Sequence, residues 1–252
     1  MPAKAFFDYA AGGDLPRLLV SPATKSRTRA RESLEQKSAR AALIAARLAR
    51  AYADIKVPLD HQNTFQLLIA VILSAQCTDA AVNKVTPELF RRYPNPAALA
   101  AAATAEIENI IRALGLYRAK AKSIQRCALR LIEEFGGEVP STMAELTRLA
   151  GVGRKTANVV LGHAFEIPGI VVDTHCRRMS QRLRLTSNED PVKIERDLNR
   201  LLDRTEWTGF SHRLIIHGRR VCYARKPACA RCVLNDLCPS ALVSADKTKF
   251  LL

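Results

Sequence analysis

Four cysteines near the C-terminal end constrain the fold of this chain more than any other feature. Cys222, Cys229, Cys232 and Cys238 are separated by six, two and five residues, so four thiols fall within 17 residues. In a chain without a secretory signal, such close spacing indicates a metal centre rather than disulfides. The backbone between these cysteines must therefore fold as one compact loop around an inorganic group.

The spacing of these thiols favours one kind of metal centre. Zinc sites usually contain two short-spaced pairs on separate knuckles, and only one such pair, Cys229 and Cys232, occurs here. A single loop that carries four sulfurs suits a cubane cluster better, although the common ferredoxin spacing differs. We therefore expect a [4Fe–4S] cluster, with zinc or unligated cysteines as the alternatives. Cys77, Cys127 and Cys176 lie apart and are expected to be small buried side chains.

The rest of the chain is dominated by helical patterns. Ser33 and Gln36 form a capping-box pattern, Thr64 is expected to cap an apolar helix, and Gly136 is a stop signal. No run alternates with a period of two, and the apolar segment 170–172 is too short for a sheet. The fold class is therefore all-α. The expected helices span about 33–54, 64–76, 79–93, 97–102, 104–113, 118–135, 141–149, 154–165, 174–184, 190–204 and 209–222.

The charge balance restricts the partners of the chain. Its 39 Lys and Arg residues outnumber 24 Asp and Glu residues, which gives a formal net charge of +15. Such a field favours a polyanion, either nucleic acid or an acidic membrane surface. No apolar run approaches the ~18 residues of a membrane span, and the longest, 65–75, is expected to be a buried core helix. We expect a cytoplasmic protein without a membrane segment.

Residues 1–33 have weak periodicity and are interpreted as a basic, flexible N-terminal extension. From Lys25 to Arg50 the chain carries eight Lys or Arg residues against two Glu, a net charge of +6. This stretch is either an electrostatic tether for nucleic acid or a solvated basic face. A tether predicts that deletion of the extension weakens DNA affinity, most of all at low salt.

A glycine-rich turn at 149–155 (LAGVGRK) stands between two expected helices. Gly151 and Gly153 permit left-handed backbone and close approach, so the following helix N-terminus can hold a phosphate without base readout. Lys155 is then a solvated side chain, a phosphate contact or a nucleophile. A lysine attacks only as a neutral amine, and a helix N-terminus and a cation such as Arg154 both disfavour its ammonium form. Asp173 is expected to cap a helix that begins at Thr174.

These segments resemble the endonuclease III family of helix-hairpin-helix DNA glycosylases. GVGRKTANVVLGHAF followed by VVDTH is similar to the hairpin, lysine and aspartate segments of that family, and the cysteine spacing is similar to its iron–sulfur signature. LSAQ at 73–76 with TD at 78–79, and GLY at 115–117, resemble segments that face DNA. The resemblance covers about residues 34–240. Ala150 stands where the family often has proline.

The resemblance implies a two-lobed fold with a site between the lobes. A helical barrel lobe is expected at 56–167, and an iron–sulfur lobe at 34–55 together with 168–252. Lys155 and Asp173 are implied to be catalytic. The implied ligands of the [4Fe–4S] cluster are Cys222, Cys229, Cys232 and Cys238, and the implied DNA contacts are Gly151, Gly153, Arg154, Gln76, Leu116 and His175.

The implied activity is base excision repair. A DNA N-glycosylase with AP lyase activity would flip an oxidised pyrimidine out of the duplex, displace it through a lysine Schiff base and nick the strand by β-elimination. Its partner would be double-stranded DNA with damaged bases or abasic sites, bound by a monomer at the nucleoid.

Three alternatives stay open. A monofunctional adenine DNA glycosylase of the same superfamily generally lacks the hairpin lysine and often has a further C-terminal domain, whereas Lys155 is present here and 14 residues follow Cys238. A non-catalytic helix-hairpin-helix DNA-binding protein would not need the pair of Lys155 and Asp173. An electron carrier fits poorly with the net charge of +15.

Overall fold

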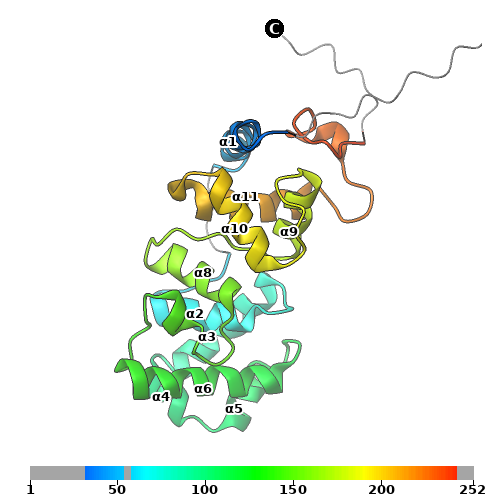
Figure 1. Ribbon diagram of the computed structural model, residues 1–252. Coiled ribbons are helices and arrows are strands. Elements are labelled where there is room, and N and C mark those ends of the chain that lie inside the picture. Colours follow the sequence, from blue (N-terminus) through cyan, green and yellow to red (C-terminus); the bar gives the residue numbers. More distant parts are fainter. Residues whose placement is uncertain (1–31, 54–57, 243–252) are drawn as a thin grey trace, which may run out of the picture. The chain divides into compact units, whose positions relative to one another are not determined.

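The computed structural model describes residues 32–53 and 58–242, and these parts of the chain are helical (Figure 1). No β-strand occurs in these ranges, which confirms the all-α class. Residues 1–31 of the predicted extension lie outside the described ranges. The α-helices are α1 (Leu34–Ala51), α2 (Thr64–Leu73), α3 (Asp79–Arg92), α4 (Pro96–Ala101), α5 (Thr104–Ile110), α6 (Tyr117–Phe135), α7 (Met143–Leu146), α8 (Arg154–Ala164), α9 (Thr174–Arg182), α10 (Pro191–Leu201) and α11 (Trp207–Arg220), with 3₁₀ turns η1 (Arg204–Glu206) and η2 (Cys229–Arg231).

Local side-chain bonds explain where these helices begin and end. The predicted capping box of α1 is confirmed, because the Ser33 hydroxyl accepts from the Gln36 N–H at 3.1 Å and the Gln36 side chain accepts from the Ser33 N–H at 3.0 Å. The prediction that Thr64 caps α2 was wrong. Asn63 holds that position, and its side-chain oxygen accepts from the Gln66 N–H at 2.9 Å, which makes Thr64 the first residue of the helix. Gly136 ends α6 with a left-handed φ of 62°, as predicted.

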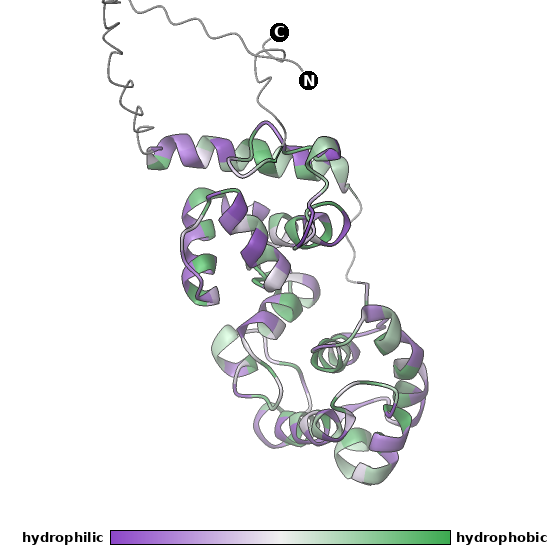
Figure 2. Cartoon of the chain, turned by 90° about the vertical axis from the view of Figure 1, so that its right-hand side faces the viewer, coloured by the Kyte–Doolittle hydropathy of each residue, from purple (hydrophilic) through white to green (hydrophobic). Residues whose placement is uncertain are grey.

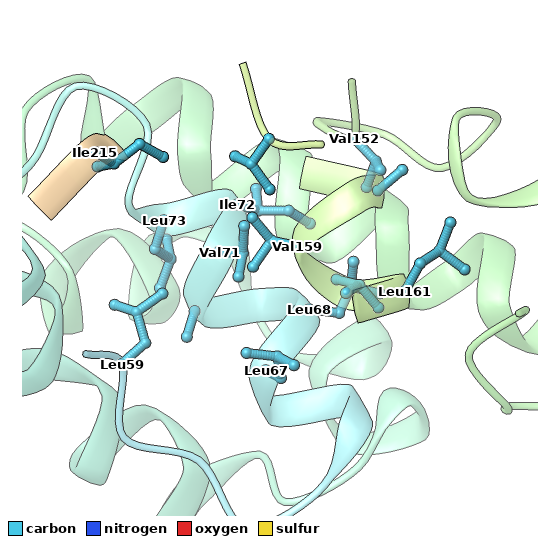
Figure 3. Packing of buried hydrophobic residues seen from close by; sticks show 14 of the residues in the cluster. Leu59, Leu67, Leu68, Val71, Ile72, Leu73, Val152, Val159, Leu161 and Ile215 are labelled. Atoms are coloured by element: carbon cyan, nitrogen blue, oxygen red, sulfur yellow. The ribbon is translucent and has the colours of Figure 1, made fainter. Parts of the chain in front are cut away.

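Helix α2 forms the centre of the hydrophobic core. Every residue from Phe65 to Leu73 is buried, because the helix has no charged side chain and is covered by α3, α6 and α8. Figure 3 shows side chains of α2, including Leu68 and Ile72, beside Val159 and Leu161 of α8. Full burial of each such side chain contributes about 1.5–3 kcal/mol. The helix ends at Leu73 rather than at the predicted Gln76, where the backbone is left-handed.

The helices form two packing groups. In the first, α2 packs against α3, α6 and α8, α6 also packs against α4 and α5, and α7 packs against α8. In the second, α1 and α9 each pack against both α10 and α11. Most helices carry both hydrophobic and hydrophilic residues (Figure 2), whereas α2 is buried on all sides. The predicted lobe boundaries at 55/56 and 167/168 remain a prediction, and residues 54–57 lie outside the described ranges.

Within the described ranges, no helix has the length and apolar character that a membrane crossing requires.

Candidate active site and metal centre

The hairpin between α7 and α8 depends on one glycine for its backbone. Gly151 has a φ of 80°, and a Cβ at this position would lie 3.0 Å from Ile72 Cγ2 and 3.2 Å from Ser123 Cβ. A side chain there would therefore strain the backbone and collide with α2 and α6. Gly153 differs, because its φ is −99° and a Cβ would meet nothing within 4 Å. The second glycine leaves open space in front of α8.

The N-terminus of α8 is open to an anion. No side chain caps this helix, and Gly153, Arg154 and Lys155 are exposed. Its first N–H groups and the positive end of its dipole therefore favour a phosphate.

Arg154 is held by an acidic partner that the sequence did not reveal. Its Nη2 lies 2.9 Å from Glu195 Oε1, and its Nε lies 3.2 Å from Oε2. Glu195 comes from α10 and also accepts from Asn158 Nδ2 at 3.4 Å. The charge of Arg154 is thus balanced by a carboxylate in the free protein.

Lys155 and Asp173 line one cavity of about 780 Å³, hereafter the Lys155 cavity. Residues from five parts of the chain form its wall, so the fold joins the two residues that the sequence singled out with others that it did not. The lining residues are Pro58, Leu59, Val71, Ser74, Asp79, Lys155, Val159, Val171, Asp173, His212, Ile215, Ile216, Arg219 and Arg220.

Asp173 has a rigid carboxylate. Its Oδ1 accepts from the N–H groups of His175 at 2.8 Å and Cys176 at 2.7 Å, which confirms the predicted cap of α9. Both bonds end on Oδ1, so Oδ2 takes no part in the cap. The cap therefore fixes the carboxylate and leaves Oδ2 outside the capping bonds.

His212 is a cavity residue that no motif indicated. Its Nδ1 lies 3.1 Å from Nε2 of His163, a residue of α8. Burial, followed by His163, Arg213 and Lys155, lowers the pKa of His212 to about 3. The imidazole is therefore neutral at pH 7. Burial also lowers the pKa of His163, so the pair adds no positive charge beside Lys155.

Two exposed residues, both implied DNA contacts, have left-handed backbone. Gln76 has a φ of 56° and Leu116 a φ of 58°, and Leu116 is 61 % exposed. This conformation costs a non-glycine residue about 1–2 kcal/mol. The two turns are tied together, because Lys120 Nζ lies 2.9 Å from Cys77 Sγ.

The three isolated cysteines do not share one environment. Cys127 and Cys176 are fully buried, as predicted, and burial raises the pKa of each thiol to about 12. The prediction of burial was wrong for Cys77, which is half-buried and bonded to the buried Lys120. This partner lies 43 residues away, so no local pattern could predict the contact.

His175 lies against α11 and is not among the residues that line the Lys155 cavity. Its Nδ1 lies 3.2 Å from Arg178 Nη2, and its Cβ would be 3.1 Å from a side chain at Gly218. Burial is the main cause that lowers the pKa of His175. The structure thus shows His175 in contact with α11, and its implied DNA contact stays a prediction.

The segment 222–238, hereafter the cluster loop, brings its four cysteines to one pocket. Cys222, Cys229, Cys232 and Cys238 line it together with apolar side chains such as Met179 and Leu234. Among the described residues, no three His, Cys, Asp or Glu side chains converge closely enough to hold a single metal ion. Four thiols on the wall of one pocket fit a polynuclear cluster with thiolate ligands.

Arginines from outside the cluster loop hold its backbone in place. Arg182 of α9 donates to the carbonyls of Tyr223 at 2.7 Å and Ala224 at 2.8 Å, and Arg47 of α1 donates to Val233 at 3.2 Å. Arg47 also pairs with Asp236, with Nη2 2.8 Å from Oδ2. The loop is thus fixed by bonds to two helices besides its cysteines.

Two segments of the chain match known protein families. Residues 69–204 match the model of the HhH-GPD superfamily of base excision DNA repair proteins, and residues 222–238 match the iron–sulfur binding domain of endonuclease III. The fold, the hairpin and the cavity thus define a helix-hairpin-helix base excision repair protein. An endonuclease III from Synechocystis sp. is 53% identical over 212 residues, covering 84% of this chain and 97% of that protein. The chain belongs to the endonuclease III family.

Further relatives agree with this assignment. Endonuclease III from Escherichia coli strain K12 is 42% identical over 180 residues, covering 71% of this chain and 85% of that protein. The structure of a trapped endonuclease III–DNA covalent intermediate has a TM-score of 0.78 at 43% identity, covering 81% of this chain and 96% of that one. A thermostable thymine-DNA glycosylase shares the fold, with a TM-score of 0.74 at 22% identity.

The family membership establishes the general activity. The chain is a base excision repair DNA glycosylase and AP lyase that binds DNA and carries a [4Fe–4S] cluster. The zinc and electron-carrier alternatives are thereby set aside.

Proposed function

We propose that this enzyme removes oxidised pyrimidines through a Schiff base on Lys155 and then cuts the strand by β-elimination. The observation that carries the proposal is that Lys155 and the rigid carboxylate of Asp173 line the same cavity. Its volume of about 780 Å³ suits a nucleotide flipped out of the duplex. The open N-terminus of α8 beside it suits a backbone phosphate.

The reaction follows from these two side chains. The lone pair of neutral Lys155 Nζ attacks C1′ of the flipped nucleotide, and the base leaves with the electrons of the glycosidic bond and takes up a proton. The nitrogen then forms an iminium with C1′ as the C1′–O4′ bond breaks, and O4′ takes up a proton while the amine gives one up. Loss of a proton from C2′ then expels the 3′ phosphate, and water releases the lysine. Oδ2 of Asp173 either accepts a proton from the amine or stabilises the positive charge at C1′.

The exposed turns supply the proposed DNA contacts. The hairpin amides around Gly151 and Gly153 would hold a phosphate, with Arg154 joining them if it exchanges Glu195 for the phosphate. Gln76 would fill the gap left by the flipped base, and Leu116 would wedge the opposite strand. Their left-handed backbone supports this, because such strain is often stored at functional sites. His175 would support DNA binding indirectly, through its contact with α11.

The cluster is proposed to be held by Cys222, Cys229, Cys232 and Cys238. When bound, it supplies four metal–thiolate bonds that keep the cluster loop folded. The loop then presents exposed Arg225, Lys226 and Arg231 as cations for the DNA backbone. The preferred partner would be duplex DNA with damaged bases or abasic sites, bound by a monomer in the cytoplasm at the nucleoid.

Borohydride trapping tests the proposed nucleophile. Wild type, Lys155→Ala and Lys193→Ala would be incubated with a duplex that contains one thymine glycol or one abasic site. Lys193 is the matched control, because it is an exposed lysine in the first turn of α10 and does not line the cavity. We expect a trapped covalent complex with wild type and Lys193→Ala, and none with Lys155→Ala.

Other outcomes of the trapping experiment would favour the alternative functions. Tight binding by wild type without a trapped complex would contradict the Schiff base and return Lys155 to a phosphate contact. Release of adenine from a mispaired duplex without nicking would then indicate the monofunctional glycosylase. A gel shift without base release or nicking would indicate a silent binder.

A further inference from the structure

One cluster cysteine is the end of a hydrogen-bond chain that starts on another helix. Cys232 Sγ lies 3.2 Å from Nε2 of His217, a residue of α11 that is 1 % exposed. On the other side of the ring, Nδ1 lies 2.9 Å from the hydroxyl of Tyr52, the residue that follows α1. The three residues come from three separate parts of the chain.

The chemistry of the sulfur sets the direction of these bonds. A cysteine bound to a cluster is a thiolate, which accepts hydrogen bonds and has none to donate. His217 Nε2 must therefore carry the proton that it shares with Cys232. In a neutral ring Nδ1 is then an acceptor, and the Tyr52 hydroxyl donates to it. The chain thus runs from Tyr52 through His217 to the sulfur.

The geometry of Tyr52 is fixed from two sides. Its carbonyl accepts from Arg213 Nε at 3.3 Å, which ties the end of α1 to α11. Its ring meets that of His217 edge to face, with centroids 5.9 Å apart and an interplanar angle of 73°. The imidazole is therefore oriented by Tyr52 on one side and by Cys232 on the other. Such a second contact orients a ligand-supporting histidine and increases its effect on the metal.

We propose that Tyr52 and His217 are positioning residues that raise the reduction potential of the iron–sulfur cluster through Cys232. Gain of one electron makes the cluster and its thiolates more negative, and a hydrogen-bond donor to a ligand sulfur stabilises that state. The apolar wall of the pocket strengthens the bond. The inference rests on the proposed cysteine ligands, but not on the proposed chemistry of Lys155.

Other contacts to the cluster sulfurs are less suited to a test of this kind. Arg182 Nη1 lies 3.1 Å from Cys222 Sγ, but the same guanidinium holds the carbonyls of Tyr223 and Ala224. Its removal would disturb the backbone of the loop as well as the potential. Among the described residues, the Tyr52 hydroxyl forms a hydrogen bond to His217 alone. Removal of this hydroxyl therefore affects only the hydrogen-bond chain to the sulfur.

The experiment compares Tyr52→Phe and His217→Phe with a matched control, Tyr223→Phe. The Tyr223 hydroxyl lies in the cluster loop and donates to the Arg220 carbonyl at 2.8 Å, without a bond to any ligand sulfur. Each full-length protein would be purified with its cluster, its iron content measured, and the potential of the one-electron couple recorded. The electrode is the electron source and the electron acceptor.

We expect Tyr52→Phe to lower the potential slightly, His217→Phe to lower it more, and Tyr223→Phe to leave it unchanged. Loss of the cluster to a mild oxidant should become several-fold faster in the same order. Equal potentials for wild type and Tyr52→Phe at full iron content would overturn the proposal, as would an equal shift in Tyr223→Phe. If His217→Phe holds no cluster, the difference in potential between Tyr52→Phe and Tyr223→Phe still tests the proposal.

Failure of this inference is distinguishable from failure of the proposed function. Borohydride trapping reports on Lys155 and needs no change in potential. A wild-type protein without iron would contradict the cysteine ligands themselves rather than the role of Tyr52.

Discussion

The Lys155 cavity and the cluster loop are built in different ways. The cavity takes its wall from residues between Pro58 and Arg220, and its carboxylate is fixed by the backbone of α9. The cluster loop takes all four of its sulfurs from 17 consecutive residues, and arginines of α1 and α9 hold it from outside. The cavity is formed by the packing of distant segments, whereas the cluster loop is formed by four cysteines that are close in the sequence.

This difference separates architecture from chemistry in the two regions. In the cavity, a side chain can lose its reactive atom while the backbone that positions it stays intact. In the cluster loop the proposed ligand sulfurs are also structural atoms, because four metal–thiolate bonds would hold the loop together. Variants of the cavity should therefore act on rate more than on stability, whereas variants of the loop should act on cluster retention.

The largest effect is expected at Asp173. Replacement by Asn should reduce the rate of strand nicking by about 10²–10⁴-fold, because the carboxylate is lost, while Asn still caps α9. Single-turnover nicking and thermal melting would be measured on the same samples. The control is Asp173→Ala, which loses the cap as well and should cost about 1 kcal/mol more in stability. A wild-type rate of strand nicking in Asp173→Asn would contradict the proposal that variants of the cavity act on rate more than on stability.

The hairpin glycines should differ in their effect on stability. Gly151→Ala places a side chain at a φ of 80° and against Ile72 and Ser123, so we expect a loss of about 1–3 kcal/mol. Gly153→Ala meets open space at a φ of −99° and should leave the free energy of unfolding nearly unchanged. Denaturant unfolding of the pair measures the difference. Equal losses would show that the fit against α2 and α6 does not determine the hairpin.

His212 should make the stability of the protein depend on pH. Its pKa is about 3 in the folded state and 6.5 in the unfolded state, so the unfolded state binds the extra proton. The stabilisation is therefore complete above pH 6.5 and is lost as the pH falls toward 3. At about pH 5 the loss is at most about 2 kcal/mol.

Unfolding of wild type and His212→Gln between about pH 7 and about pH 5 would measure this contribution. We expect a smaller decrease in the variant, because Gln does not titrate. An identical pH dependence in both proteins would mean that the imidazole is not kept neutral in the cavity.

The smallest effect is expected at Arg47, which holds the cluster loop from α1. Its pair with Asp236 is partly exposed, so Arg47→Ala should cost about 1 kcal/mol or less. Arg47 lowers the pKa of Asp236, so this stabilisation is present at neutral pH and lost on strong acidification. Loss of cluster absorbance with time should be faster than in wild type.

Arg91→Ala is the matched control for Arg47. Arg91 pairs with Glu88 on α3 at 2.9 Å, in a helix that has no part in the cluster pocket. The control should not change cluster retention. The same loss rate in both arginine variants would show that the loop needs only its thiolates.

Residues close in the chain could be predicted because their interactions are local. The capping box of Ser33 and Gln36, the cap by Asp173 and the stop at Gly136 involve residues within a few positions of each other. The cysteine spacing likewise places four sulfurs on one loop. Asn63 in place of Thr64 shows the limit of this reasoning, since two adjacent residues had the same chemistry for the cap.

The sequence by itself therefore determined the helical class, most helix ends, the cluster loop and the family. Hydrogen bonds between residues three or four positions apart set the helix ends, and the spacing of the cysteines sets the loop, so neither needs a tertiary contact. Tertiary structure alone decided which side chains face each other. Arg154 meets Glu195 across 41 residues, Lys120 meets Cys77 across 43, and Tyr52 meets His217 across 165. Such pairs depend on how amphipathic helices pack, and a pattern of apolar positions states which face is buried but not against which helix.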